Sequence, residues 1–409
     1  MATTRILLLS NQDPEARAED PPLVTRVESF GGDDTPIAPR RTTHHTHDIR
    51  SSLPSDAPRA TPPFEPRRLA REDGSEAAAA SVRAALSKAP GVQVLHRSVL
   101  RPSEVTAAIG EHRPSVIFNL CESLNNDSRL EMAVAWMLDR LALPFTGSPH
   151  FALRHCLHKY EASWILRRAG VPVPTTVRAD SPDHIPDVAF PVIVKPERED
   201  GSVCIERGSV VFDRASLRDR VALVIETCKQ PALVQRFIHG RELSVSLLGG
   251  PDPRVLPLGE IAFNDAACGA PCVLTWASKW RESSAEYRTS PSVAAVLRPN
   301  EVRRFAAVGK RAFDVLGLRD YGRVDLRIDP QGHPFVIDVN PNCDVSPVGG
   351  FALAAARGGL SYEDLVWEIV RSAIRRGDGA FDVGGSRGRR RLPARVRQRP
   401  APLAAAGAR

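Results

Sequence analysis

Apolar and polar positions alternate along two neighbouring segments in the carboxyl-terminal third of the chain, residues 321–329 and 335–340. Between them lie Pro, Gln, Gly and His at 330–333, residues that favour a turn. Two segments of period two around a turn predict a β-hairpin, in which alternate side chains share a face.

The register that we predict divides this hairpin into an apolar and a polar face. The apolar face pairs Ile328 with Phe335, Leu326 with Ile337 and Val324 with Val339, and the polar face pairs Arg327 with Val336, Asp325 with Asp338 and Arg323 with Asn340. Opposed like charges destabilise a sheet, so Asp325 and Asp338 require a cation between them. With Asn340 they offer three hard oxygen donors, which suit Mg²⁺ or Mn²⁺ beside a nucleotide. The alternative is a solvated face on which Arg323 and Arg327 neutralise the acids.

The amino-terminal part alternates between strand and helix patterns. Apolar runs predict strands at 4–10, 92–97 and within 114–123, and helical periodicity predicts helices within 74–91, with Ser75 as N-cap, and 128–144. This alternation is typical of a parallel α/β domain, which we expect to end near Ser148.

The remaining patterns are mixed. We expect one helix over 156–174, two strands around a polar loop within 190–212, two strands around a turn within 231–250, a strand within 255–263, and helices over 300–317 and 361–376.

Composition indicates an ordinary globular protein. The chain has 409 residues, of which 42% are hydrophobic and 25% charged, enough for two or three domains. It holds no apolar run of about 18 residues, and the run at its start is too short for a signal peptide, so we expect a cytoplasmic protein without membrane contact. Its seven scattered cysteines favour reduced thiols.

Two segments have the composition of disordered chain. Residues 11–72 are rich in Pro, Asp, Arg, Thr and Ser without periodicity, and their His-rich stretch at 43–48 is expected to be solvated coil. The tail, 377–409, contains eight arginines from Val383 onward and no acid there, although the whole chain has a net charge of +7. Loose association of this tail with nucleic acid is the alternative to a free tail, and we do not favour it because no aromatic residue lies among these arginines.

Candidate nucleotide contacts lie in two other segments. Lys195 ends a buried strand, and the loop at 200–203 offers backbone N–H groups and a hydroxyl to phosphates. Phe237 and Ile238 have the character of an adenine pocket, and Glu242 could hold ribose hydroxyls. The alternative for this segment is an ordinary hairpin turn.

Taken together, these elements resemble the ATP-grasp superfamily and, within it, the D-alanine–D-alanine ligase-like branch. The likeness runs in order from about Ile6 to Arg376, outside the insertion and the tail, through the motifs FNLCES, LPFTGS, HKYEASWILRRAGVPVP, FPVIVKPEREDGSV, LVQRFIHGRELSV, ASKWRESSAEYR, YGRVDLRID, VIDVNPN and GLSYEDLVWEIV.

The resemblance implies a fold and a domain order. It implies an ATP-grasp fold, in which two α+β subdomains clamp ATP, after a parallel α/β amino-terminal domain. The expected domains are residues 1–150 with the disordered insertion at about 11–72, subdomain 1 at 151–235 with the lysines and phosphate loop, subdomain 2 at 236–376 with the metal and acceptor site, and the disordered Arg-rich tail at 377–409.

The resemblance also implies roles for individual residues. The expected ATP contacts are Lys159 and Lys195 on the phosphates, Gly201 and Ser202 in the phosphate-covering loop, Gln235, Phe237 and Ile238 at the adenine, and Glu242 at the ribose. The expected catalytic residues are Lys279, followed by Trp280, near the γ-phosphate, and Arg323 at the tetrahedral intermediate. The expected metal ligands are Asp325, Asp338 and Asn340.

Three departures from the family pattern bear on activity. Asp338 stands where the family usually has Glu, Gln235 stands where it usually has an acid, and Gly349 stands where D-alanine–D-alanine ligases carry a Ser that binds the second substrate's carboxylate. We therefore predict an ADP-forming ligase that joins a small carboxylate to an amine using ATP and Mg²⁺ or Mn²⁺. The alternatives are D-alanine–D-alanine ligase itself, an ATP-grasp phosphotransferase and a non-catalytic nucleotide-binding protein. The oligomeric state stays open, with a homodimer among the options.

Overall fold

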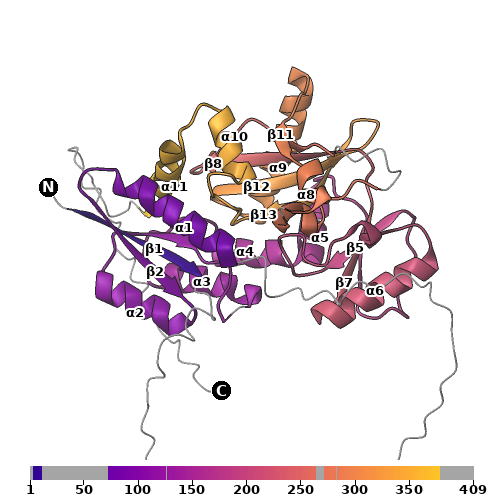
Figure 1. The fold of residues 1–409 in the computed structure, drawn as a ribbon, viewed down its shortest axis with the longest axis horizontal. Coiled ribbons are helices and arrows are strands. Elements are labelled where there is room, and N and C mark those ends of the chain that lie inside the picture. The colour runs from indigo at the N-terminus through magenta and orange to yellow at the C-terminus, as the bar shows by residue number, and fades with distance from the viewer. Residues whose placement is uncertain (1–2, 12–71, 126, 264–270, 282, 378–409) are drawn as a thin grey trace, which may run out of the picture.

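The structure is a computed structural model that describes residues 3–11, 72–125, 127–263, 271–281 and 283–377. The predictions for the 11–72 insertion, apart from its end residues, and for the tail beyond 377 lie outside these residues. Figure 1 shows three groups of elements, each built on its own sheet.

The amino-terminal sheet is parallel, as predicted. Its strands have the order β2 (Val92–Val99), β1 (Thr4–Asn11) and β3 (Val116–Leu120). Around it lie α1 (Glu72–Ser87), α2 (Pro102–His112), a 3₁₀ turn (Ser128–Leu130) and α3 (Glu131–Arg140). Helix α1 begins at Glu72, so the prediction of Ser75 as its N-cap is wrong, because helical structure already exists one turn earlier. Apolar side chains fill both sides of this sheet, as expected where helices cover both faces.

The second sheet is small and antiparallel, with the order β4 (Thr176–Ala179), β7 (Ala232–Arg236), β5 (Val192–Pro196) and β6 (Val210–Val211). Helix α6 (Arg214–Cys228) packs on it, and a 3₁₀ turn (Arg207–Ser209) leads into β6. Preceding this sheet are α4 (His150–Leu157) and α5 (Lys159–Arg168). We predicted one helix over 156–174, but the backbone leaves helical angles at His158, so that Lys159 begins the second helix.

The third sheet contains the predicted hairpin. Its order is β11 (Ser292–Ala294), β10 (Gly259–Ile261), β8 (Arg241–Gly249), β12 (Asp320–Ile328) and β13 (Pro334–Asn340), and β9 (Arg254–Val255) pairs with β8. The helices of this part are α7 (Trp276–Trp280), α8 (Ala285–Thr289), α9 (Pro299–Leu316), α10 (Gly350–Arg357) and α11 (Tyr362–Gly377). The two strands predicted within 231–250 are confirmed as β7 and β8, but they belong to different sheets and do not pair with each other.

The hairpin register is confirmed in one half and wrong in the other. Arg323 pairs with Asn340, Val324 with Val339 and Asp325 with Asp338, as predicted, but then the register shifts, so that Leu326 faces Val336, Arg327 faces Phe335 and Ile328 faces Pro334. Ile337 is the extra residue of this β-bulge. The cause is packing: Val336 is buried in the core with Leu326 and Ile328, whereas Ile337 turns to the same side as Asp338.

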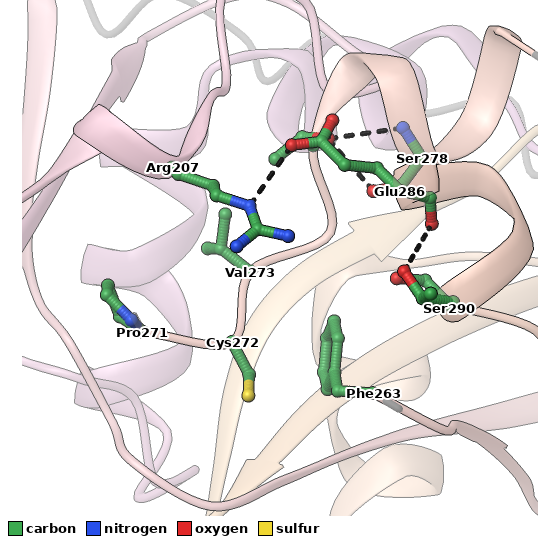
Figure 2. Close-up of a pocket in the computed structure, with 10 residues that line it drawn as sticks. Arg207, Phe263, Pro271, Cys272, Val273, Ser278, Glu286 and Ser290 are labelled. Carbon is green, nitrogen blue, oxygen red and sulfur yellow. Dashed lines mark hydrogen bonds and ion pairs between the residues drawn. The ribbon is translucent and has the colours of Figure 1, made fainter. Parts of the chain in front are cut away.

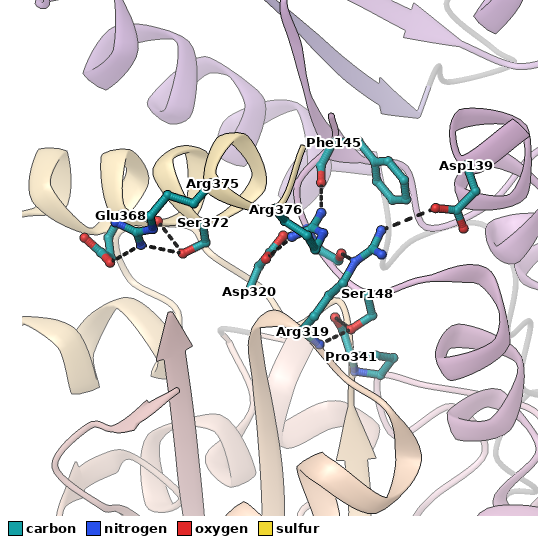
Figure 3. Close-up of polar contacts among 11 residues, drawn as sticks. Asp139, Phe145, Ser148, Arg319, Asp320, Pro341, Glu368, Ser372, Arg375 and Arg376 are labelled. Atoms are coloured by element: carbon teal, nitrogen blue, oxygen red, sulfur yellow. Dashed lines mark hydrogen bonds and ion pairs between the residues drawn. The ribbon is translucent and has the colours of Figure 1, made fainter. Parts of the chain in front are cut away.

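Buried polar contacts join the amino-terminal sheet to the hairpin (Figure 3). Asp320, 1% exposed, accepts hydrogen bonds from the backbone of Gly147 and from the guanidinium of Arg376. Arg376 also donates to the carbonyl oxygen of Phe145, and Arg319 donates to that of Gly147. Because Asp320 is the first residue of β12, these contacts fix where the hairpin begins relative to residues 145–148.

Candidate functional site

A cavity of about 640 Å³ lies between the second and third sheets. It brings together nine of the thirteen site residues predicted from the sequence: Lys195, Ser202, Gln235, Phe237, Ile238, Glu242, Lys279, Asp325 and Asp338. The other four do not line the cavity, but each is placed by its neighbours. Lys159 contacts Asp338, Arg323 and Asn340 contact Asp325, and Gly201 precedes Ser202.

Lys159 lies at the start of α5 and bridges two carboxylates. Its Nζ atom is 2.6 Å from Oδ1 of Asp338 and 3.0 Å from Oδ1 of Asp200. Burial alone would lower the pKa of Lys159, but the charges of Asp200 and Asp338 outweigh it and raise that pKa. Conversely, burial would raise the pKa of Asp338, but Lys159 and Lys195 lower it to about 2. Both shifts describe one buried ion pair, fully charged at neutral pH.

Lys195 lies at the end of β5 and has no carboxylate at ion-pair distance among the described residues. Its Nζ atom donates to the carbonyl oxygen of Ile337 at 3.2 Å. Burial, only partly offset by the charge of Asp338, lowers the pKa of Lys195 to about 8. A buried ammonium of this kind is well suited to an incoming phosphate, which would supply the missing negative charge.

Asp325, Asp338 and Asn340 meet as the hairpin register predicted. Asp325 accepts two hydrogen bonds from Arg323, at 2.7 and 2.9 Å, and one from the amide of Asn340 at 3.1 Å. This pairing raises the pKa of Arg323, although burial opposes it. The amide of Asn340 donates its N–H, so its Oδ1 atom stays available to a cation.

These donors fit a divalent ion. Within the described part of the chain, no three His, Cys, Asp or Glu side chains gather as a metal site. A cation here would therefore be held by the two carboxylates and the amide, with phosphate oxygens and water completing its shell, an arrangement that Mg²⁺ favours.

The residues predicted to contact adenine lie where the chain crosses from β7 to β8. The side chain of Gln235 donates to Thr176 at 3.0 Å, and Phe237 and Ile238 are buried. This crossing also needs a glycine: Gly240 has φ +127°, and a Cβ atom there would lie 1.9 Å from the carbonyl oxygen of Ile328. The alternative of an ordinary hairpin turn at this position is thus excluded.

Sequence reasoning missed one central residue, Arg327. Its guanidinium pairs with Glu242 at 2.7 Å, donates to the carbonyl oxygen of Cys272, and stacks 5.2 Å from the ring centroid of Phe237. The alternation of the strand could have identified Arg327 as a site residue, because it lies two residues after Asp325 and on the same face. Ile193, Ile205 and Ile337 also line the cavity, and their apolar character gave no signal for a site.

The predicted phosphate loop contacts a tryptophan. The indole Nε1 of Trp280 donates to the carbonyl oxygen of Gly201 at 2.8 Å, and a Cβ atom at Gly201 would lie 3.4 Å from that ring. Lys279, one residue earlier, is half-buried, and burial together with the charge of Arg323 lowers its pKa. The loop therefore contacts α7, whose residue Lys279 lines the cavity.

A smaller cavity of about 330 Å³ borders the main one and shares Val273 with it. Figure 2 shows Arg207 and Glu286 facing each other across it, with a distance of 3.2 Å between Nε and Oε1. Glu286 also accepts a hydrogen bond from Thr275, the N-cap residue of α7. These contacts tie α7 and α8 to the segment that follows the phosphate loop.

Comparisons with known proteins agree with this geometry. The family model "D-ala D-ala ligase C-terminus" matches residues 174–371. An uncharacterized protein of Sinorhizobium fredii is 33% identical over 267 residues, which cover 64% of this chain and 75% of that protein. A D-alanine–D-alanine ligase of Desulforudis audaxviator is 31% identical over 60% of this chain and 77% of that enzyme. The chain belongs to the D-alanine–D-alanine ligase family.

The fold of this family is also found among solved structures. A D-alanine–D-alanine ligase from Bacillus anthracis superposes with a TM-score of 0.62, covering 92% of this chain and 99% of that enzyme at 15% identity. The same enzyme complexed with ATP gives 0.59, covering 75% and 96% at 18% identity. The ATP-grasp fold and the preceding parallel sheet are thus confirmed. As a member of the D-alanine–D-alanine ligase family, the chain is an ATP-dependent, ADP-forming ligase of carbon–nitrogen bonds. Among the described residues, no helix is both long and apolar enough to cross a membrane.

Proposed function

We propose that this ligase activates a small carboxylic acid, an amino acid or short peptide, with ATP and joins it to an amine other than D-alanine. One observation carries the proposal: Lys195, Lys279, Asp325 and Asp338 line the same cavity as Gln235 and Phe237. Cationic groups for phosphates, acidic groups for a metal and an apolar hinge for a purine therefore occur together, as phosphoryl transfer requires.

The first step is phosphoryl transfer. An oxygen of the substrate carboxylate bonds to the γ-phosphorus of ATP, the bond to the β–γ bridging oxygen breaks, and ADP leaves with that electron pair. Lys159 and Lys195 hold the phosphates, and Lys279 offsets the charge on the transferred group. Asp325, Asp338 and Asn340 would hold Mg²⁺ or Mn²⁺, which supplies further charge compensation at the phosphates.

The second step forms the amide bond. The amine nitrogen bonds to the acyl carbon, the bond from that carbon to the phosphate oxygen breaks, and phosphate leaves with the electron pair while an N–H proton passes to phosphate or water. Arg323, held by two hydrogen bonds to Asp325, faces the developing oxyanion. A donor placed in this way contributes about 3–4 kcal/mol to the stability of the transition state.

The amine substrate is where we propose that this chain differs from its relatives. Gly349 offers no hydroxyl where the family places its carboxylate-binding Ser, and a Cβ atom there would lie 2.6 Å from Oδ2 of Asp344. D-alanine–D-alanine ligase activity is therefore not what we propose for this chain.

The test is a screen of purified protein for ADP release and for trapping of the acyl phosphate with hydroxylamine, against amino acids and short peptides. We expect ADP and hydroxamate in equal amounts, and neither with Asp325→Asn. ADP without hydroxamate would instead indicate a phosphotransferase. Binding of an ATP analogue without turnover for any acid would indicate a non-catalytic nucleotide-binding protein.

A further inference from the structure

The loop at 341–349 connects the predicted metal strand to α10 and contacts the amino-terminal sheet. The hydroxyl of Ser148 donates to the carbonyl oxygen of Pro341 at 3.3 Å, and the amide of Asn342 donates to that of Cys121 at 3.2 Å. Cys121 directly follows β3, at the carboxyl edge of a parallel sheet, where α/β proteins bind ligands. The loop thus lies between that edge and Asn340, so an amine approaching the acyl carbon would meet it.

Asp344 is the exposed acid of this loop. Its carboxylate accepts hydrogen bonds from the backbone N–H of Ser346 at 2.8 Å and from the hydroxyl of Ser346 at 2.9 Å. Within the described part of the chain, no Lys, Arg or His lies at ion-pair distance from it, whereas Asp325 pairs with Arg323 and Asp338 with Lys159. Asp344 therefore keeps an uncompensated negative charge in fixed orientation.

The Asp344 carboxylate lies beside Gly349, where a larger residue would contact it. Gly349 is buried at the N-cap of α10 with φ −67°, so its backbone conformation suits any residue. A Cβ atom there, however, would lie 2.6 Å from Oδ2, 2.9 Å from Cγ and 3.0 Å from the carbonyl oxygen of Asp344. Asp344 thus occupies the space in which a side chain at 349 would lie.

The charge of Asp344 acts on two further groups. The thiol of Cys343 is buried, which raises its pKa to about 12, and the charges of Arg323 and Asp344 act on that pKa in opposite directions. The hydroxyl of Tyr362 is buried and has no hydrogen-bond partner among the described residues, and the charge of Asp344 acts on it too. Asp344 thus follows the predicted metal ligand Asn340 by four residues, in a loop whose Cys343 also feels the charge of Arg323.

We propose that the 341–349 loop selects an amine substrate that carries a second positive charge and has no carboxylate beside its reacting nitrogen, with Asp344 recognising that charge. A diamine is the class that fits. An exposed carboxylate attracts an ammonium and repels a second carboxylate, so a free amino acid such as D-alanine is disfavoured. The unprotonated nitrogen would form the C–N bond as described above, while the distal ammonium stays paired with Asp344. This inference rests on the proposed function.

The first experiment measures binding and needs no acid substrate. 1,4-Diaminobutane and D-alanine are titrated calorimetrically into the full-length protein saturated with ADP and Mg²⁺. We expect the diamine to bind the wild type, and Asp344→Asn to raise its dissociation constant about tenfold. The matched control, Asp219→Asn, removes one exposed charge on α6 and leaves binding unchanged. Equal diamine affinities for the wild type and Asp344→Asn would overturn the proposal, as would tighter binding of D-alanine than of the diamine.

The second experiment separates this inference from the proposed function. Hydroxylamine is small and uncharged near neutral pH, so it traps an acyl phosphate without using Asp344. With an acid that gives hydroxamate, Asp344→Asn is expected to raise KM for 1,4-diaminobutane about tenfold and to leave the hydroxamate rate unchanged. Hydroxamate formation with an unchanged KM for the diamine would contradict the inference alone. Absence of hydroxamate with every acid would contradict the proposed function, and the titration would still decide whether Asp344 binds a diamine.

Discussion

The ammonium of Lys195 donates a hydrogen bond to the main-chain oxygen of Ile337, and this contact joins the second sheet to the third. Ile337 is the residue inserted by the bulge in β13, and Asp338 follows it. The lysine predicted to bind phosphate and the strand predicted to bind metal are therefore positioned by one another.

The first prediction concerns the protonation of Lys195. Its pKa of about 8 is below the ordinary value of 10.5, because burial disfavours the charged form. Since phosphate binding requires that form, nucleotide affinity is expected to fall as pH rises above about 8, and binding near pH 8 should take up protons. Calorimetric titration of an ATP analogue in two buffers of different ionisation enthalpy measures this uptake.

Lys195→Met is the control for this titration, since it removes the ionising group and should abolish the proton uptake. The sign for stability follows from the same shift. The folded protein binds fewer protons than the unfolded chain between about pH 8 and 10.5, so this group makes the protein more stable as pH rises through that window. Uptake that persists in Lys195→Met would refute the assignment.

Asp338 is expected to set the metal requirement. Asp338→Asn removes one carboxylate from the predicted metal site, while Lys159 keeps its contact with Asp200. We expect the Mg²⁺ concentration for half-maximal ADP release to rise at least about tenfold, with little change in the unfolding midpoint. Asp200→Asn serves as the comparison, because it removes the other partner of Lys159 and leaves the metal site complete. Equal metal requirements for the two variants would argue against Asp338 as a ligand.

The buried pair between Asp320 and Arg376 is expected to stabilise the fold. Asp320→Ala removes the buried carboxylate that pairs with Arg376 and accepts from the N–H of Gly147, so unfolding in urea should cost about 3 kcal/mol less. Glu368→Ala provides a matched control on the same helix, because it breaks the exposed contact with Arg375 seen in Figure 3 and should change stability by less than about 1 kcal/mol. Similar losses in both variants would contradict this ranking.

Gly240 is expected to tolerate no side chain. Gly240→Ala combines a φ of +127° with a contact of 1.9 Å to a backbone oxygen, so strand β12 or the crossing from β7 to β8 would have to move. We expect a loss of stability of at least about 2 kcal/mol and weaker nucleotide binding. Gly250→Ala, where a Cβ atom meets nothing within 4 Å, should be nearly neutral. Thermal unfolding with and without an ATP analogue checks both variants.

Much of this organisation follows from the sequence, and the misses have physical causes. Alternation placed Asp325 opposite Asp338 correctly, because the buried Val324 and Val339 fix that part of the register. The register predicted from alternation is wrong beyond the bulge, because a strict period of two does not allow for one extra residue. The separation of β7 from β8 was missed for a similar reason: local sequence predicts strands but not the sheet that each strand joins.

Arg327 was missed as a site residue because a charged side chain on a predicted polar face needs no partner to explain it. Its role depends on Glu242 and Phe237, which are about ninety residues away in the chain. The insertion at 11–72 and the arginine-rich tail were assigned from composition alone. The structure does not describe them beyond residues 11, 72 and 377.

The bulge in β13 limits which deletions this strand can tolerate during evolution. A substitution at 336 or 339 alters only the volume of one core position, and neighbouring side chains can adjust to it. Deleting Ile337 would restore strict alternation, but it would remove the main-chain oxygen that accepts the hydrogen bond from Lys195 and one apolar wall of the cavity. We therefore expect the length of this strand to be less variable among functional descendants of the chain than the identities of its apolar residues.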